Sequence, residues 1–123
     1  MQRRILLAED NEDACSLFTL ILEVEGYEVK ACNDGETALA EFKQSPPDLL
    51  LTDLSLPKMD GFALIQAIKQ DESFSHIPII LITAYGMGRL KHLRPLGVTC
   101  VLEKPIEPDK LTQAVQIALQ PPT

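Results

Sequence analysis

The segment DLLLTDLSLPKMDG, residues 48–61, combines an apolar run, a polar residue directly after it, a proline-containing loop and a residue suited to cap a helix. The run 49–51 is short and purely apolar, which is typical of a strand buried on both faces of a parallel sheet. Asp60 is suited to cap a helix that packs Phe62, Leu64, Ile65 and Ile68 inward. The segment therefore predicts a strand, a loop and a helix of an α/β fold.

Similar units precede and follow this segment, because short apolar runs alternate with amphipathic stretches along the chain. Helices are expected from Asn11 to Gly26, after a cap at Asp34, and from Pro108 onward. Further strands are expected at residues 5–8, 28–32, 79–82 and 100–102. The residues expected to face inward on the helices are Ala14, Leu17, Phe18, Ile21, Leu22, Ala38, Leu39, Phe42, Leu111, Ala114, Val115, Ala118 and Leu119. This alternation is typical of βα units on a parallel sheet.

Composition excludes several classes of protein. The length of 123 residues fits one domain, residues 1–123, with 119–123 as a C-terminal tail or the start of a linker. A net charge of −7 argues against binding to nucleic acid phosphates, which needs a basic face. No apolar stretch approaches the ~20 residues of a membrane span, and the first apolar run stops at Glu9, too early for a secretory signal. We therefore expect a cytoplasmic protein that contacts neither nucleic acid nor membrane.

The three cysteines, Cys15, Cys32 and Cys100, show no Cys-x-x-Cys spacing and stand in apolar surroundings. We expect them to be reduced and buried, as small hydrophobic side chains.

Polar side chains recur where the apolar runs end. Glu9 and Asp10 follow the first run, and Asp53, Thr83 and Lys104 stand at the ends of three later ones. Because the carboxyl ends of parallel strands lie along one edge of the sheet, these residues are expected to form one acidic pocket that contains a lysine.

Such a pocket suits two kinds of chemistry. Converging carboxylates are ligands for a hard divalent cation such as Mg²⁺, and without a cation they would raise one another's pKa. A carboxylate can also attack phosphorus to form an acyl phosphate, with Mg²⁺ and a lysine neutralising charge on the transferred group. Lys104 supplies the cation and Thr83 a hydroxyl donor.

The segments Ala8-Glu9-Asp10-Asn11, 53–61, Thr83-Ala84 and Lys104-Pro105 resemble the receiver domain of two-component response regulators. The resemblance covers essentially the whole chain, and segment 53–61 is its most specific motif. It implies a flavodoxin-like, doubly wound, five-stranded parallel sheet of order 2-1-3-4-5 with helices on both faces.

The resemblance also implies roles for individual residues. Asp53 is the expected phosphoacceptor, and Thr83 and Lys104 are expected to contact the phosphoryl group. The expected Mg²⁺ ligands are Asp10, Asp53 and the backbone carbonyl of Ser55, with Glu9 orienting the metal through water. The Lys104–Pro105 bond is expected to be cis, which is uncommon among bonds to proline. Ser55 and Tyr85 are expected to tune the lifetime of the phosphoryl group.

Two departures from the family pattern concern the part of the domain that passes the signal to a partner. Val101 stands where most receivers have Tyr or Phe three residues before the lysine, so the usual aromatic switch cannot operate there. The span from Thr83 to Lys104 is one residue shorter than is common, and its glycines and proline leave at most a short helix near 87–93. We expect residues 85–96 to be mobile or irregular.

The leading interpretation is a phosphorylatable switch that takes a phosphoryl group from a histidine kinase or a histidine phosphotransfer protein. Its output would pass to a partner protein or to an effector domain of a parent chain. No enzyme activity is expected beyond self-catalysed phosphotransfer and slow autodephosphorylation. The main alternative is a docking module that works without phosphorylation. A metal-dependent phosphatase would need a second Asp two residues after the nucleophile, where Ser55 stands.

Each residue taken alone also has an ordinary structural explanation. Glu9 and Asp10 would favour the N-terminus of a helix, and Asp53 would suit a turn. The functional interpretation therefore depends on all five residues occurring together, in order.

Overall fold

The strands form a single parallel sheet in the order β2-β1-β3-β4-β5. The computed structural model describes residues 2–84 and 97–120. The strands are β1 (Arg4–Ala8), β2 (Glu28–Cys32), β3 (Leu49–Asp53), β4 (Ile79–Thr83) and β5 (Cys100–Glu103). This order confirms the predicted α/β, flavodoxin-like architecture. It places β1 and β3 next to each other, and the predicted metal ligands lie at the end of these strands or directly after it.

The helices begin where the sequence predicts them to begin. They are α1 (Glu12–Val24), α2 (Gly35–Gln44), α3 (Gly61–Lys69) and α4 (Pro108–Leu119), with a 3₁₀ turn η1 (Glu72–Phe74) that was not predicted. Asn11, Asp34 and Asp60 cap the first three helices, each through a side-chain oxygen that accepts a backbone N–H. Leu119, where the tail was expected to start, is the last residue of α4. Within the described ranges, no helix is long and apolar enough to cross a bilayer.

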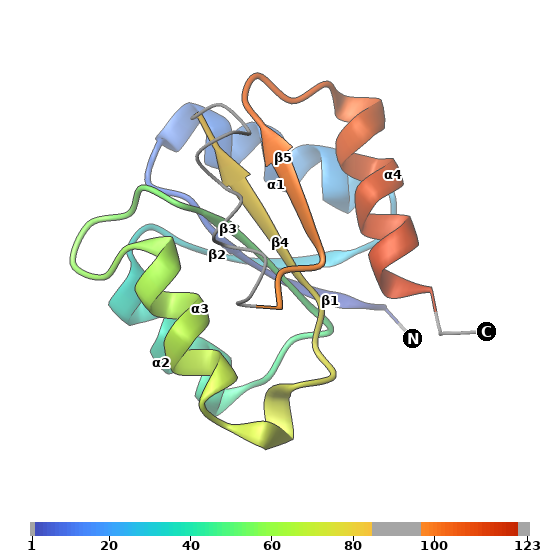
Figure 1. Ribbon diagram of the computed structural model, residues 1–123. Helices are drawn as coiled ribbons and strands as arrows, with labels where there is room; N and C mark the ends of the chain where they lie inside the picture. The colour runs from blue at the N-terminus through green and yellow to red at the C-terminus, as the bar shows by residue number, and fades with distance from the viewer. Residues whose placement is uncertain (1, 85–96, 121–123) are drawn as a thin grey trace.

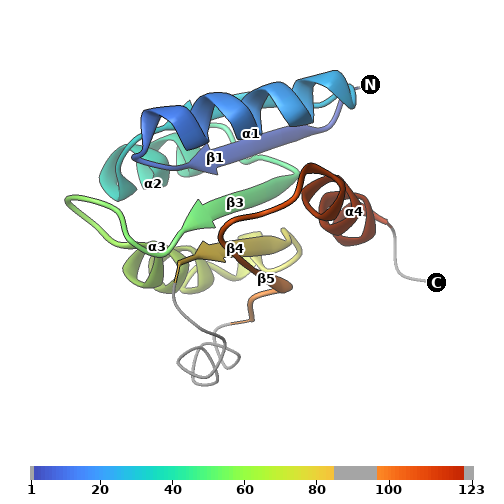
Figure 2. The ribbon, with the colours of Figure 1, turned by 90° about the horizontal axis from the view of Figure 1, so that it is seen from above.

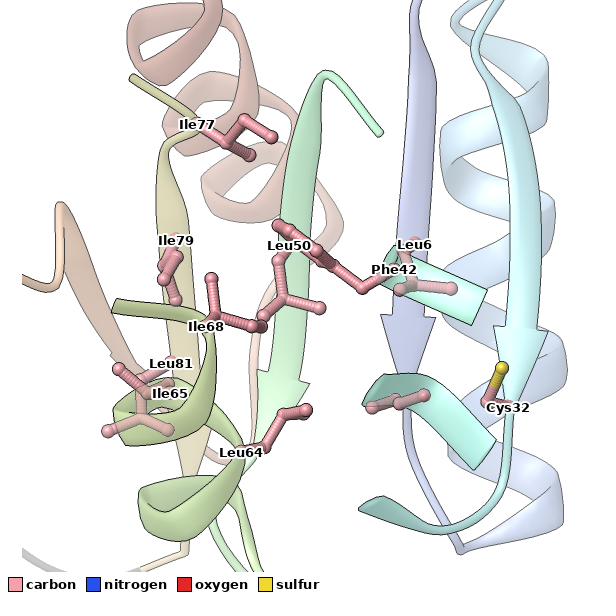
Figure 3. Packing of buried hydrophobic residues seen from close by; sticks show 12 residues of the cluster. Leu6, Cys32, Phe42, Leu50, Leu64, Ile65, Ile68, Ile77, Ile79 and Leu81 are labelled. Atoms are coloured by element: carbon pink, nitrogen blue, oxygen red, sulfur yellow. The ribbon is translucent and has the colours of Figure 1, made fainter. Parts of the chain in front are cut away.

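Two apolar layers hold the helices on the sheet. Figure 1 shows α2 and α3 together on one side of the sheet and α1 and α4 on the other. Side chains alternate between the layers along β3, where Leu50 faces α2 and α3 while Leu49 and Leu51 face α1 and α4. Figure 3 shows Leu50 beside Phe42 of α2, and the residues of α3 against β4. Burial on both faces explains the near-continuous apolar runs of the central strands.

Three predictions of burial were wrong in part. Leu17 was expected to face inward, but 49% of it is exposed, because α1 buries only the narrower stripe that contains Phe18 and Leu22. All three cysteines are free thiols, as expected, but Cys32 is buried while Cys15 and Cys100 are only half-buried. Burial raises the pKa of each of these thiols, which keeps them protonated and weakly nucleophilic.

Candidate functional site at the carboxyl edge of the sheet

The polar residues at the strand ends meet at one edge of the sheet. Figure 2 shows the arrows of β1, β3 and β4 pointing the same way, so their carboxyl ends share this edge. Ala8 pairs with Thr52, Asp53 with Ile82, and Thr83 with Glu103. The predicted site residues stand at these strand ends or directly after them, so they are neighbours in space. They are Glu9, Asp10, Asp53, Thr83 and Lys104.

Lys104 links two of the carboxylates. Its Nζ lies 2.7 Å from Asp53 Oδ2 and 2.8 Å from Glu9 Oε1. The backbone N–H of Lys104 donates to the carbonyl of Thr83 at 2.8 Å, which fixes the residue to the end of β4. The Lys104–Pro105 bond is cis, as expected. Burial lowers the pKa of Lys104, but its contacts with Asp53 and Glu9 outweigh that effect and raise the pKa overall.

Glu9 is a buried carboxylate, with only 1% of the residue exposed. Its backbone N–H donates to the carbonyl of Cys32 at 3.0 Å, and its Oε2 accepts from the N–H of Asn11 at 3.0 Å. Oε1 contacts Lys104 Nζ at the distance of an ion pair, but no donor among the described residues is aligned with it for a hydrogen bond. Desolvation raises the pKa of Glu9, and Asp53 adds to that effect, although Lys104 and the Asn11 amide oppose it.

Asp53 is held from both sides of its carboxylate and is also buried. Oδ1 accepts from the backbone N–H of Ser55 at 3.0 Å, and Oδ2 accepts from Lys104. The buried hydroxyl of Thr52 donates to the carbonyl of Asp53 at 3.0 Å. The contacts with Ser55 and Lys104 fix the orientation of the carboxylate at the carboxyl edge of the sheet, a geometry suited to a nucleophile or a metal ligand.

The loop after Asp53 requires a glycine where it enters α3. The N–H of Gly61 donates to the carbonyl of Leu54 at 2.8 Å, and a Cβ at Gly61 would lie 2.2 Å from the carbonyl oxygen of Asp53. Leu54 donates in turn to Ile82 of β4 at 2.9 Å. No side chain fits between α3 and the end of β3, so Gly61 is fixed by close backbone approach.

The acidic residues fit a divalent cation. One carboxylate oxygen from each of Glu9, Asp10 and Asp53 lies within 4.8 Å of the others. Hard oxygen ligands around an exposed Asp10 suit Mg²⁺, which keeps several waters. Glu9 Oε1, buried and without an aligned donor, is a suitable acceptor for a metal-bound water. The predicted cluster therefore has the chemistry of a magnesium site.

The structure gives the burial or the contacts of three further predicted residues, Thr83, Ser55 and Val101. Thr83 is fully buried at the end of β4. Ser55 contacts Asp53 through its N–H, and the role of its carbonyl stays a prediction. Val101 is half-buried and packs against the α2 and α3 layer. Tyr85 and the predictions for residues 85–96 lie outside the described residues.

Sequence reasoning missed the hydroxyl of Thr52 and the close backbone approach of Gly61. Thr52 ends an apolar run and looked like an ordinary strand residue. A glycine directly after a helix cap was the one available signal for a close approach of α3.

Known proteins resemble this chain over almost its whole length. A family model described as response regulator receiver domain matches residues 5–116. The polar-differentiation response regulator DivK of Brucella ovis is 32% identical over 117 residues, which are 94% of this chain and 95% of the relative.

Solved structures agree with this match. A putative response regulator from Chloroflexus aurantiacus superposes with a TM-score of 0.91 at 30% identity, covering 97% of this chain and 98% of that one. The chemotaxis response regulator CheY4 of Vibrio cholerae also gives a TM-score of 0.91, at 27% identity, covering 97% and 100%. The likeness therefore extends over the full lengths of these proteins.

Proposed function

The chain belongs to the response regulator receiver domain family of two-component signalling, and on this premise we propose that Asp53 accepts a phosphoryl group from a histidine kinase or a histidine phosphotransfer protein. The observation that carries the proposal is the buried Asp53 carboxylate, which lies 2.7 Å from the Lys104 ammonium beside two further carboxylates. In this setting a carboxylate is oriented and its charge is balanced.

The proposed step is a displacement at phosphorus. A carboxylate oxygen of Asp53 attacks the phosphorus of a phosphohistidine, and the bond from phosphorus to the imidazole nitrogen breaks. That nitrogen keeps the electron pair and takes up a proton, which leaves an acyl phosphate on Asp53. Lys104 and the hydroxyl of Thr83 are proposed to contact the phosphoryl oxygens, where negative charge accumulates.

Glu9, Asp10, Asp53 and the Ser55 carbonyl are the residues that would hold Mg²⁺. When bound, the ion supplies positive charge for the carboxylates and the phosphoryl oxygens. In the described structure Lys104 balances Glu9 and Asp53 by itself. Once the carboxylates have a second source of positive charge, the Lys104 ammonium is available to the phosphoryl group.

The acyl phosphate is proposed to persist as a signal. Ser55 stands two residues after Asp53, and its side chain is too weak a base to activate water for rapid hydrolysis. We therefore propose slow autodephosphorylation with no turnover of phosphate esters, and Ser55 and Tyr85 as the residues that tune its rate.

A second candidate function, docking without phosphorylation, is favoured by one observation. Val101 packs against the apolar layer of α2 and α3, and its side chain has no ring to move between two positions. The two functions differ in a binding experiment, because only a switch changes its affinity for a partner on phosphorylation. In either case we propose that residues 1–123 act as one receiver domain whose output passes to a partner protein or to an effector domain of a longer chain.

Beryllofluoride with Mg²⁺ tests the proposal, because it mimics a phosphoryl group on a carboxylate. We expect large NMR shifts at Thr83 and Lys104 in the wild type and none in Asp53→Asn. Asp60→Asn is the matched control, because the amide keeps the cap on α3 and leaves the pocket intact. An Asp53→Asn response equal to the wild-type response would contradict the assignment of Asp53.

A further inference from the structure

The loop that joins β3 to α3 rests on the first turn of α2. A Cβ at Gly35, the first residue of α2, would lie 1.8 Å from the carbonyl oxygen of Met59 and 2.8 Å from its Cβ. Figures 1 and 2 both show this loop, in light green, reaching the start of α2, in teal. The contact joins elements far apart in sequence, and only a residue without a side chain allows it.

Further contacts hold the loop in this position. The N–H of Gly35 donates to the carbonyl of Pro57 at 3.3 Å. Lys58 has a φ of 67°, a left-handed conformation that is unusual for a residue with a side chain. Its Nζ lies 3.9 Å from Asp34 Oδ2. The loop is thus held in a specific and unfavourable backbone conformation against α2.

The turn before α2 is itself firmly fixed. The buried carboxylate of Asp34 accepts from the N–H of Thr37 at 2.7 Å and from its hydroxyl at 3.0 Å. The same turn follows Cys32, whose carbonyl accepts from the N–H of Glu9. Residues 33–35 therefore follow directly on the residue that bonds to the backbone of Glu9, and they contact the Ser55 loop through Gly35.

We propose that Asp34 and Gly35 are positioning residues that set the loop of Ser55 relative to Asp53 and Glu9, and thereby the affinity of the pocket for Mg²⁺. The metal part of this inference rests on the proposed function. Gly35 acts through Pro57 and Met59 and does not touch the pocket. Outer contacts of this kind typically change metal affinity by about 10–100-fold when they are removed.

Gly35→Ala tests the inference, with Gly26→Ala as the matched control. Gly26 has a φ of 95° and no described atom within 4 Å of its Cβ position, so alanine there strains the backbone far from the loop. In metal-free protein, Gly35→Ala is expected to shift the Ser55 amide resonance, because that N–H bonds to Asp53 Oδ1. In titrations with Mg²⁺ alone, the dissociation constant should rise about tenfold or more. Gly26→Ala should change neither quantity.

A second pair of variants applies if Gly35→Ala does not fold. Asp34→Ala removes the cap of α2 and so frees the first turn of that helix. Asp71→Ala is the matched control, because Asp71 caps η1 in the same way, by accepting from the N–H and the hydroxyl of Ser73. This second cap lies beyond the far end of α3. Asp34→Ala is expected to weaken Mg²⁺ binding and to shift the Ser55 amide, and Asp71→Ala to do neither.

Equal effects of the test and control variants, or no effect of either test variant, would overturn the inference. A wild-type protein that bound no Mg²⁺ would instead contradict the proposed function. The Ser55 shift in metal-free protein would then still decide whether Gly35 and Asp34 set the loop.

Discussion

Along β3, Leu49, Leu50 and Leu51 are fully buried, and so is Thr52, while Asp53 is 5% exposed. The three leucines lie among apolar side chains of four helices. The carboxylate of Asp53 instead contacts Lys104, which also contacts Glu9, and the hydroxyl of Thr52 donates to the carbonyl of Asp53. Burial of the leucines stabilises the fold. Burial of the carboxylates costs desolvation energy, as the raised pKa of Glu9 indicates.

The apolar residues within the strands, here called the strand bodies, stabilise the fold, whereas the polar residues at the strand ends form the candidate site. The bodies of the strands would serve any flavodoxin-like protein. The ends contain buried carboxylates whose desolvation has a cost that Lys104 only partly offsets in Glu9, an arrangement suited to binding a ligand. Three substitutions test this division, in order of decreasing effect on the free energy of unfolding.

Leu50→Ala should have the largest effect, because it leaves a cavity in the layer between the sheet and α2 and α3. We expect the free energy of unfolding to fall by about 2–5 kcal/mol in urea titrations. The Mg²⁺ affinity of the folded variant should stay at the wild-type value. A tenfold loss of affinity would show that strand bodies and strand ends are not separable.

Lys104→Met should have a smaller effect that depends on metal. The substitution leaves Glu9 and Asp53 close together without their shared cation. In metal-free buffer we expect a loss of about 1–3 kcal/mol, less than for a fully buried pair because Lys104 is partly exposed. The loss should shrink as Mg²⁺ is added. Lys110→Met, at an exposed position of α4, should stay within about 0.5 kcal/mol of the wild type at every Mg²⁺ concentration. A metal-independent loss in Lys104→Met would contradict the account.

Glu9→Gln should have the smallest effect on stability and a clear effect on its pH dependence. The pKa of Glu9 is raised in the folded state, so between the ordinary glutamate pKa and this raised value the folded protein holds a proton that the unfolded chain releases. The free energy of unfolding should therefore fall as pH rises through that interval. Urea titrations across this range, without metal, should show a shallower fall in Glu9→Gln.

The same variant should also bind Mg²⁺ about tenfold more weakly. An unchanged pH slope in Glu9→Gln would mean that burial of Glu9 has no energetic cost, and an unchanged affinity would remove Glu9 from the metal site.

Much of the fold could be predicted because its signals are local. Apolar runs predicted the strands, and Asp34 and Asp60 were identified as caps from their residue types and positions. The first helix was expected to start at Asn11, which proves to be its cap. The exposure of Leu17 was missed, because an apolar stripe on a helix does not reveal how wide its buried part is.

The members of the site could be predicted, but not their contacts. Residue order placed Glu9, Asp10, Asp53 and Lys104 at one edge of the sheet, where they lie. The sharing of Lys104 between two carboxylates depends on side-chain geometry, and the contact of Gly35 with Met59 depends on how two loops pack. Neither feature has a local sequence signal.

The phosphorylation of Asp53 is the central claim, and the mass of the intact protein tests it most directly. After incubation with acetyl phosphate and Mg²⁺, we predict that the wild type gains the mass of one phosphoryl group, that chelation of Mg²⁺ prevents the gain, and that Asp53→Asn shows none. An equal gain in wild type and Asp53→Asn, or no gain in the wild type at saturating Mg²⁺, would contradict the claim.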